Sequence, residues 1–192
     1  MAEKPVLDEL ALFGLRLSAI ADLSRRPDCE RAIPVLLRWL GKVNNAAVKE
    51  DIVRALSVPW ARPIAAAPLI NEFTNADMKT GVALKWAIGN ALSIVADDGS
   101  FEAIADLARD RRHGRAREML VLALGRMTQP AATDVLMELL ADDEVAGHAI
   151  IALGKLRAER AKARIIGFQD HKMAWIRREA RKAIKRIEAR RV

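Results

Sequence analysis

The strongest concentration of chemically active side chains is basic and lies near the end of the chain. Residues 155–192 carry 14 Lys and Arg against 4 Asp and Glu, a net charge of +10. Residues four positions apart share one face of a helix, so a helix in this region would present two adjacent basic stripes. The stripes are Arg178, Lys182 and Arg186, and Arg177, Arg181 and Lys185.

Two interpretations fit these basic stripes. Rows of Lys and Arg bind the phosphates of DNA, RNA or another polyanion, and they also suit an anionic membrane surface. Alternatively, they form the polar outer face that the last unit of a helical stack needs for solubility. Trp175 alone offers a base a stacking platform here, which argues against binding of single strands.

Residues that could catalyse a reaction or bind a metal are scattered. His113, His148 and His171 are far apart in the sequence, and Cys29 is the one cysteine, which excludes an internal disulfide and a multi-thiolate metal site. The sequence has no phosphate-binding glycine loop and no nucleophile elbow. We therefore predict no catalytic residues, no metal and no cofactor, and a protein that is not an enzyme.

An internal repeat indicates the elements that must position these residues. An Ala-Leu or Ala-Ile dipeptide recurs at intervals of 36, 32, 29 and 31 residues, the length of two short helices and two turns. We call the second residue of this dipeptide the anchor of its repeat. The anchors are Leu56, Leu92, Leu124, Leu153 and Ile184. Mostly apolar residues four and eight positions earlier share the anchor's helical face, so each anchor belongs to the second helix of a pair.

The repeat predicts an all-α fold, with about five antiparallel helix pairs forming one α–α superhelix after an N-terminal helical cap. The composition agrees, because 35 Ala stand against 4 Phe, 4 Trp and no Tyr, which favours helices over strands. We expect a single domain over residues 1–192. The cap covers 1–26, and the repeats cover 28–57, 62–96, 98–127, 130–156 and 158–191.

Three segments resemble a known repeat. Residues 121–127 (VLALGRM), 151–156 (IALGKL) and 175–184 (WIRREARKAI) are similar to short HEAT repeats of the kind found in phycobilisome-lyase-type proteins. A basic residue seven positions before the anchor resembles the arginine of the second HEAT helix. It occurs at Lys49, Lys85, Arg117 and Arg177. The resemblance implies an armadillo-like α-solenoid, an architecture used by scaffolds, adaptors and a few enzymes.

In such a solenoid the second helices would line a concave surface. Positions six and two before each anchor face away from the core, and Glu118 and Gly147 are among them. The candidate partner-binding residues at these positions are Trp86, Asn90, Leu122 and Ile151. An exposed Trp with aliphatic neighbours is a good anchor for a protein partner, so we predict that this strip binds a protein or a second copy of the chain. The alternative is that packing buries the strip.

The resemblance also suggests one enzymatic alternative. HEAT-like alkylpurine DNA glycosylases hold a damaged base on a concave cationic surface with aromatic and acidic side chains. The corresponding residues here would be Trp86 and Trp175 with Asp51 or Glu118. Acidic residues of the N-terminal and central second helices disfavour phosphate, so a protein-binding scaffold is the first expectation. DNA or RNA binding by the C-terminal repeat is the second.

Charge and hydropathy restrict the cellular setting. The chain has 32 Lys and Arg against 25 Asp and Glu, a net charge of +7, but residues 1–154 alone carry 18 against 21, a net charge of −3. The first ten residues are too polar for a signal peptide, and no apolar run approaches the ~18 residues of a membrane span. We expect a cytoplasmic protein without a transmembrane segment.

Overall fold

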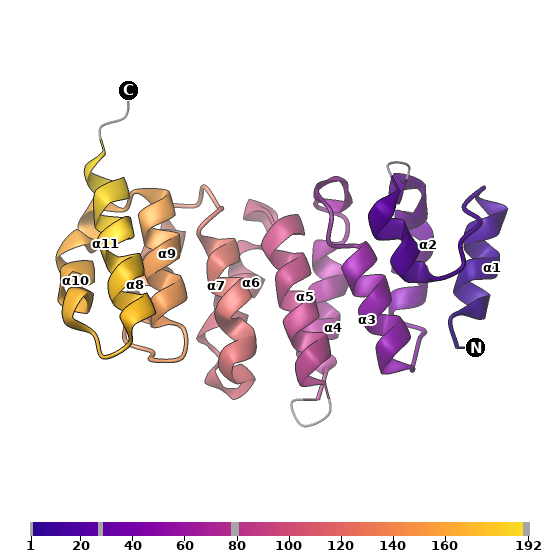
Figure 1. Cartoon of the computed structure of the whole chain (residues 1–192), viewed down its shortest axis with the longest axis horizontal. Coiled ribbons are helices and arrows are strands. Elements are labelled where there is room, and N and C mark those ends of the chain that lie inside the picture. Colours follow the sequence, from indigo (N-terminus) through magenta and orange to yellow (C-terminus); the bar gives the residue numbers. More distant parts are fainter. Residues whose placement is uncertain (1, 27–28, 78–80, 190–192) are drawn as a thin grey trace. The chain divides into compact units, whose positions relative to one another are not determined.

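The computed structural model of the chain describes residues 2–26, 29–77 and 81–189. These residues form α-helices and short 3₁₀ helices (η) and contain no strand, so the predicted all-α fold is confirmed (Figure 1). The chain consists of two compact units, residues 1–97 and 98–192, called unit 1 and unit 2 below. Residues 28 and 191, where the first predicted repeat begins and the last one ends, lie outside the described residues.

Each unit combines α-helices with short 3₁₀ turns. Unit 1 contains α1 (Lys4–Leu12), η1 (Ile20–Arg25), η2 (Cys29–Ala32), α2 (Ile33–Leu40), α3 (Ala46–Ala55), η3 (Pro59–Ala61), α4 (Ala66–Asn75) and α5 (Val82–Val95). Unit 2 contains η4 (Asp98–Ser100), α6 (Phe101–Arg109), η5 (Arg111–Arg117), α7 (Glu118–Leu124), α8 (Ala131–Leu139), α9 (Ala146–Leu156), η6 (Glu159–Ala161), α10 (Lys162–Ile166), η7 (Gly167–Asp170) and α11 (Ala174–Glu188). Within the described ranges, none of the helices combines the length and the apolar character that crossing a membrane requires.

In unit 1 the helices pack in pairs. α2 contacts α3, α4 contacts α5, and α3 contacts both α5 and η1. The anchors Leu56 and Leu92 are both 0% exposed. Asn45 begins α3, because its side-chain oxygen accepts a hydrogen bond of 3.1 Å from the Val48 N–H, as an N-cap asparagine does.

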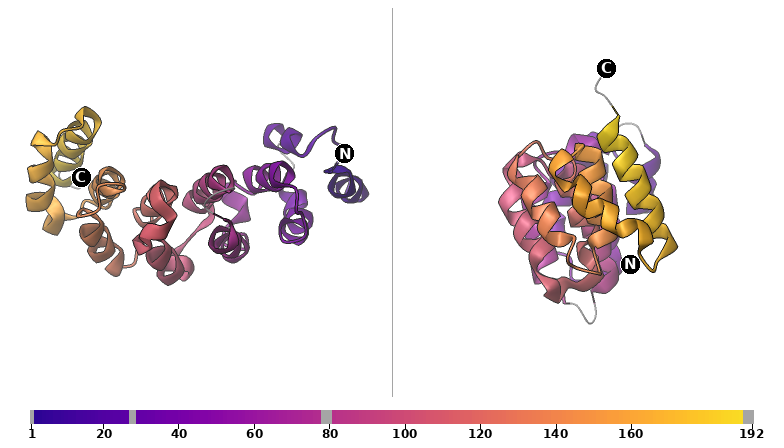
Figure 2. Two further views of the ribbon diagram at one scale, coloured as in Figure 1. Left: turned by 90° about the horizontal axis from the view of Figure 1, so that it is seen from below. Right: turned by 90° about the vertical axis from the view of Figure 1, so that its left-hand side faces the viewer.

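Unit 2 uses the same pairing. α6 contacts α7, α8 contacts α9, and α10 contacts α11, while the second helices contact each other in the order α7, α9, α11. Figure 1 and Figure 2 show α7, α9 and α11 side by side, with α6, α8 and α10 in a second layer. The anchors Leu124 and Leu153 are 0% exposed and Ile184 is 9% exposed.

Small residues permit the contact between successive second helices of unit 2. A Cβ atom added to Gly125 would lie 2.7 Å from the Cβ of Ala152, and one added to Gly154 would lie 2.7 Å from the Cα of Ala183. These separations are too short for real Cβ atoms. Ala152 and Ala183 are the first residues of the repeated dipeptide, so its alanine marks where the preceding second helix approaches.

The basic residues seven positions before the anchors serve different contacts. Lys49 on α3 forms an ion pair of 2.6 Å with Glu72 on α4, which joins the first two helix pairs. Lys85 is 1% exposed, with its ammonium 5.0 Å from the centroid of the Phe73 ring. Arg177 donates to two backbone carbonyls of the turn before α11. The column is therefore structural at all three positions.

Arg117 is the most deeply buried member of this column. Its side chain is 0% exposed, and its guanidinium pairs with Asp142 at 2.8 Å and Glu144 at 2.7 Å in the turn before α9. It also donates to the carbonyls of Ala108 and Gly114. Because a buried charge without partners is very unfavourable, this network ties the helix pair α6–α7 to the start of α9.

Replacing Arg117 with alanine should lower the free energy of unfolding by about 3 kcal/mol, because the buried Asp142 would lose its buried counterion and keep only the exposed Arg111, 3.3 Å away. The matched control is Arg160→Ala. It breaks an ion pair whose side chains, Arg160 and Asp134, are 66% and 57% exposed, and it should cost at most about 1 kcal/mol. Urea unfolding followed by circular dichroism measures both, and equal losses would contradict a structural role for the buried network.

Candidate functional site

The partner-binding strip predicted from the sequence is divided between the two units. Trp86 and Asn90 lie on α5 in unit 1, whereas Leu122 on α7 and Ile151 on α9 lie in unit 2. Leu122 and Ile151 are partly exposed on neighbouring helices. A single strip through all four residues stays a prediction, and each unit offers a surface of its own.

The second helices of unit 1 expose a tryptophan. Trp86 is 51% exposed, and Val82, one helical turn earlier on α5, is 53% exposed. We call these two residues the apolar patch. The Asn90 side chain donates to the carbonyl of Trp86 at 3.2 Å, so its amide serves its own helix. Val82 was not among the sequence candidates, although it lies four residues before Trp86 and shares its face.

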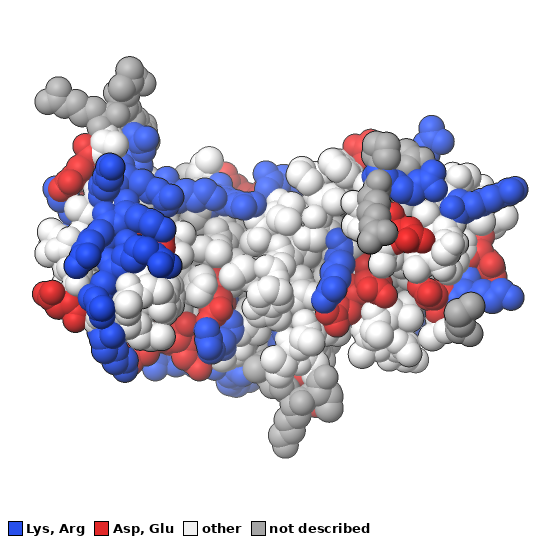
Figure 3. All heavy atoms as spheres, in the orientation of Figure 1, with Lys and Arg blue, Asp and Glu red and all other residues white. Residues whose placement is uncertain are grey.

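Charged side chains lie on the helix that packs against α5. Glu50 and Arg54 form an ion pair on α3, the helix that packs against α5, and the Arg54 side chain is 67% exposed. Figure 3 shows mostly uncharged atoms over α5 and both signs of charge over α3. An apolar centre with a polar rim is the usual anatomy of a protein interface.

In unit 2, Glu118 and Gly147 are buried, and our expectation that they lie on an open face is wrong. A Cβ added to Gly147 would lie 2.0 Å from Cη2 of Trp175, so the indole on α11 covers this position of α9. Arg115 donates to the Glu118 carboxylate at 2.7 Å, and Nε2 of His148 lies 3.8 Å from the same carboxylate. Trp175 is thus a packing residue between two helices rather than a free stacking platform.

The surroundings of His148 in this cluster are unfavourable for its polar ring. Its ring lies 5.7 Å from the Trp175 ring, centroid to centroid, and its buried Nδ1 atom has no hydrogen-bond partner in the part of the chain that the structure describes. Burial lowers the pKa of His148, the charge of Glu118 raises it, and the charge of Arg115 lowers it further. The neutral imidazole is therefore the form that the folded unit favours.

This arrangement predicts a pH dependence of stability. The folded state binds the His148 proton less readily than the unfolded chain, whose histidines titrate near pH ~6.5. The unfolded state then binds more protons as the pH falls through that range, so the free energy of unfolding should decrease. Urea unfolding from pH 7.5 to pH 5.5 tests this. His148→Gln should flatten the dependence and His171→Gln should retain it; the same slope in wild type and His148→Gln would refute the assignment.

The six basic residues predicted on the last helix do not share one environment. Arg177 is partly buried and bonds to the preceding turn. Arg178 and Lys182 both pair with Glu179, at 3.3 Å and 2.8 Å. The remaining three are exposed on α11: Arg181, Lys185 and Arg186.

Lys155 on α9 lies near two other basic residues of unit 2. The pKa of Lys155 on α9 is lowered by burial and then by the positive charges of Arg126, which follows α7, and Arg186 on α11. All three residues are exposed, and we call them the cationic surface. Figure 3 shows Lys and Arg atoms gathered over α11, with a row of them continuing along the upper side of unit 2 in that view.

The cationic surface belongs to the more basic of the two units. This unit has 20 Lys and Arg against 14 Asp and Glu, a net charge of +6, whereas unit 1 has 12 against 11, a net charge of +1. Like charges at short range repel one another, and a bound anion would relieve that repulsion. Arg126 was not among the predicted basic residues, because those were chosen along a single helix. Alignment of the repeats could have found it, since all three residues stand two positions after their anchors.

Comparison with protein-family models and with curated proteins finds no match to this chain. Among the described residues, no group of three or more His, Cys, Asp or Glu side chains is arranged to hold a metal ion.

Proposed function

We propose that the chain is a HEAT-like helical-repeat scaffold without enzymatic activity, and that it binds a protein partner through the second helices of unit 1. The observation that carries the proposal is the half-exposed Trp86 beside Val82 on α5. The contacts within each helix pair, and between successive second helices inside each unit, support the HEAT-like solenoid, since repeat solenoids bury their cores by stacking such pairs.

The energetics favour a partner at the apolar patch. Removing exposed apolar surface from water is favourable by about 25 cal/mol per Å², and Trp is one of the side chains enriched among residues that dominate binding energy. The ion pair of Glu50 and Arg54 on α3 is suited to the rim of such a contact, because charged pairs at a rim set orientation more than affinity.

Trp86→Ala should weaken binding of the protein partner by about 2 kcal/mol or more, a loss of roughly 30-fold in affinity. The wild-type chain and the variant are compared as baits in quantitative affinity purification, with nuclease present. The matched control is Trp60→Ala, because Trp60 on η3 of the same unit is 43% exposed but lies outside the apolar patch. Recovery of the same proteins by all three baits would refute this site, and sedimentation of the pure chain identifies a second copy as the partner.

A second function is supported by the cationic surface, namely binding of a duplex nucleic acid by unit 2. Lys155 lies within the electrostatic influence of Arg126 and Arg186, so three successive second helices bring positive charge to one surface. Phosphate contacts by such a surface need no sequence readout and weaken steeply with salt. The alternative from the sequence, a polar cap for the last helix, accounts for Arg186 but does not account for the two cations on the preceding repeats.

The triple variant Arg126→Gln, Lys155→Gln, Arg186→Gln should bind duplex DNA at least tenfold more weakly than wild type. Its slope of log affinity against log salt should be smaller by up to about three, at roughly 0.9 per phosphate contact. Fluorescence anisotropy measures both quantities. The control with the same change in net charge is Arg109→Gln, Arg160→Gln, Arg164→Gln, and equal losses in the two triple variants would show that net charge alone is responsible.

A further inference from the structure

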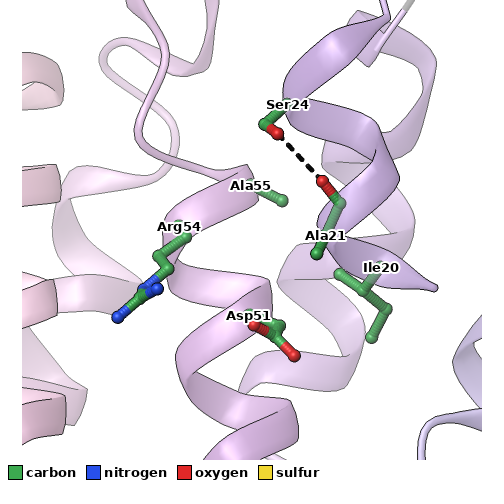
Figure 4. Close-up of a pocket in the computed structure, with 6 residues that line it drawn as sticks. All are labelled: Ile20, Ala21, Ser24, Asp51, Arg54 and Ala55. Atoms are coloured by element: carbon green, nitrogen blue, oxygen red, sulfur yellow. Dashed lines mark hydrogen bonds between the residues drawn. The ribbon is translucent and has the colours of Figure 1, made fainter.

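A second feature of unit 1 lies on the side of α3 that packs against η1. A cavity of about 170 Å³ opens between these elements, and Figure 4 shows the side chains around it. Its lining residues are Ile20, Ala21, Ser24, Asp51, Arg54 and Ala55. A water molecule takes up about 30 Å³ of liquid, so the cavity has room for a short chain of several heavy atoms.

The Asp51 carboxylate has no hydrogen-bond or ion-pair partner among the described side chains. Arg54 is close enough to act on its charge, but the guanidinium of Arg54 pairs with Glu50 and points away from Asp51 in Figure 4. The Ser24 hydroxyl donates to the carbonyl of Ala21 at 2.9 Å. Its oxygen still has an acceptor lone pair, so the cavity offers hydrogen-bond acceptors to a ligand that donates.

Keeping Asp51 ionised destabilises the fold. Burial raises the pKa of Asp51, the charges of Glu3 and Glu50 raise it further, and the charge of Arg54 opposes them. An acid whose pKa is higher in the folded state than in the unfolded state gives up its proton less readily after folding, so its ionisation at neutral pH lowers stability. A carboxylate that opposes folding and lies in a cavity is a candidate binding group.

We infer that the cavity between η1 and α3 binds a cationic side chain, lysine or arginine, of the protein partner. The positive group would meet the Asp51 carboxylate, and the alkyl stem would pack against Ile20, Ala21 and Ala55. Charge complementarity carries the choice, because Glu50 and Arg54 neutralise each other as an ion pair, which leaves the Asp51 carboxylate with the further negative charge of Glu3 near it. The inference rests on the proposed scaffold function, since α3 also contacts α5, which carries the apolar patch.

The experiment uses blocked amino acids as probes of the full chain. N-acetyl-lysine-N-methylamide and the corresponding arginine compound are titrated while backbone amide shifts are recorded by NMR. We expect shifts at residues 20–24 and 51–55, with a Kd of about 1–10 mM, equivalent to roughly 3–4 kcal/mol of binding free energy. The uncharged norleucine and citrulline compounds should bind at least tenfold more weakly, and the lysine and arginine titrations decide which cation fits better.

Two variants and one control test the role of the carboxylate. Asp51→Asn keeps the shape but removes the charge, so it should weaken probe binding at least tenfold; its thermal midpoint should not fall below that of wild type. Glu30→Gln, at an exposed position of η2, is the control and should bind like wild type. Arg54→Gln should bind the probes as tightly as wild type or more tightly, because it removes the competing cation beside the cavity.

Three results would overturn the inference: no shift at about 50 mM probe, well above the expected Kd, equal binding of citrulline and arginine compounds, or unchanged binding by Asp51→Asn. Probe binding should also weaken as the pH falls toward the raised pKa of Asp51, which lies above the ordinary value of about 3.9. Failure of this inference is separable from failure of the scaffold proposal, because the probe assay needs no partner. Trp86→Ala should leave probe binding intact even where it abolishes capture of the partner.

Discussion

The close approach of successive second helices is the constraint on which the rest of unit 2 depends. Gly125 meets Ala152 and Gly154 meets Ala183 at distances that leave no room for another Cβ atom. Because these contacts use the smallest side chains, the larger neighbours in each repeat must point elsewhere, with the anchors into the core and the residue two positions later toward solvent. The positions of Arg126, Lys155 and Arg186 on the exposed side follow from this packing.

At Gly147 a small residue makes room for a large side chain instead of a second small one. Here the missing Cβ leaves space that the Trp175 ring fills, and the ring closes over His148. The contacts of α9 therefore change along its length. Near its beginning it packs against an aromatic ring, and toward its end its alanine and glycine pack against other small residues. The indole consequently contributes to packing between α9 and α11, which argues against the glycosylase alternative that gave Trp175 a role in holding a base.

The sequence predicted the helical class and the core because both depend on local periodicity. Four of the anchors are fully buried, because apolar residues repeated at helical spacing form one face of a helix, and that face packs into the core. They are Leu56, Leu92, Leu124 and Leu153. The burial of Glu118 was not predictable in this way, because it depends on Arg115 and His148 from different elements. The cavity at Asp51 was missed for a related reason, since η1 is a short 3₁₀ turn without a periodic pattern.

The groups that we assign to binding are ones that do not stabilise the fold. The Asp51 carboxylate resists ionisation where it is placed, Lys155 lies among like charges, and the indole of Trp86 remains half in water. By contrast, Lys49 and Arg117 have their charges matched by carboxylates. The two groups occupy different positions relative to the anchors, because Lys49 and Arg117 stand seven residues before an anchor and Lys155 stands two residues after one.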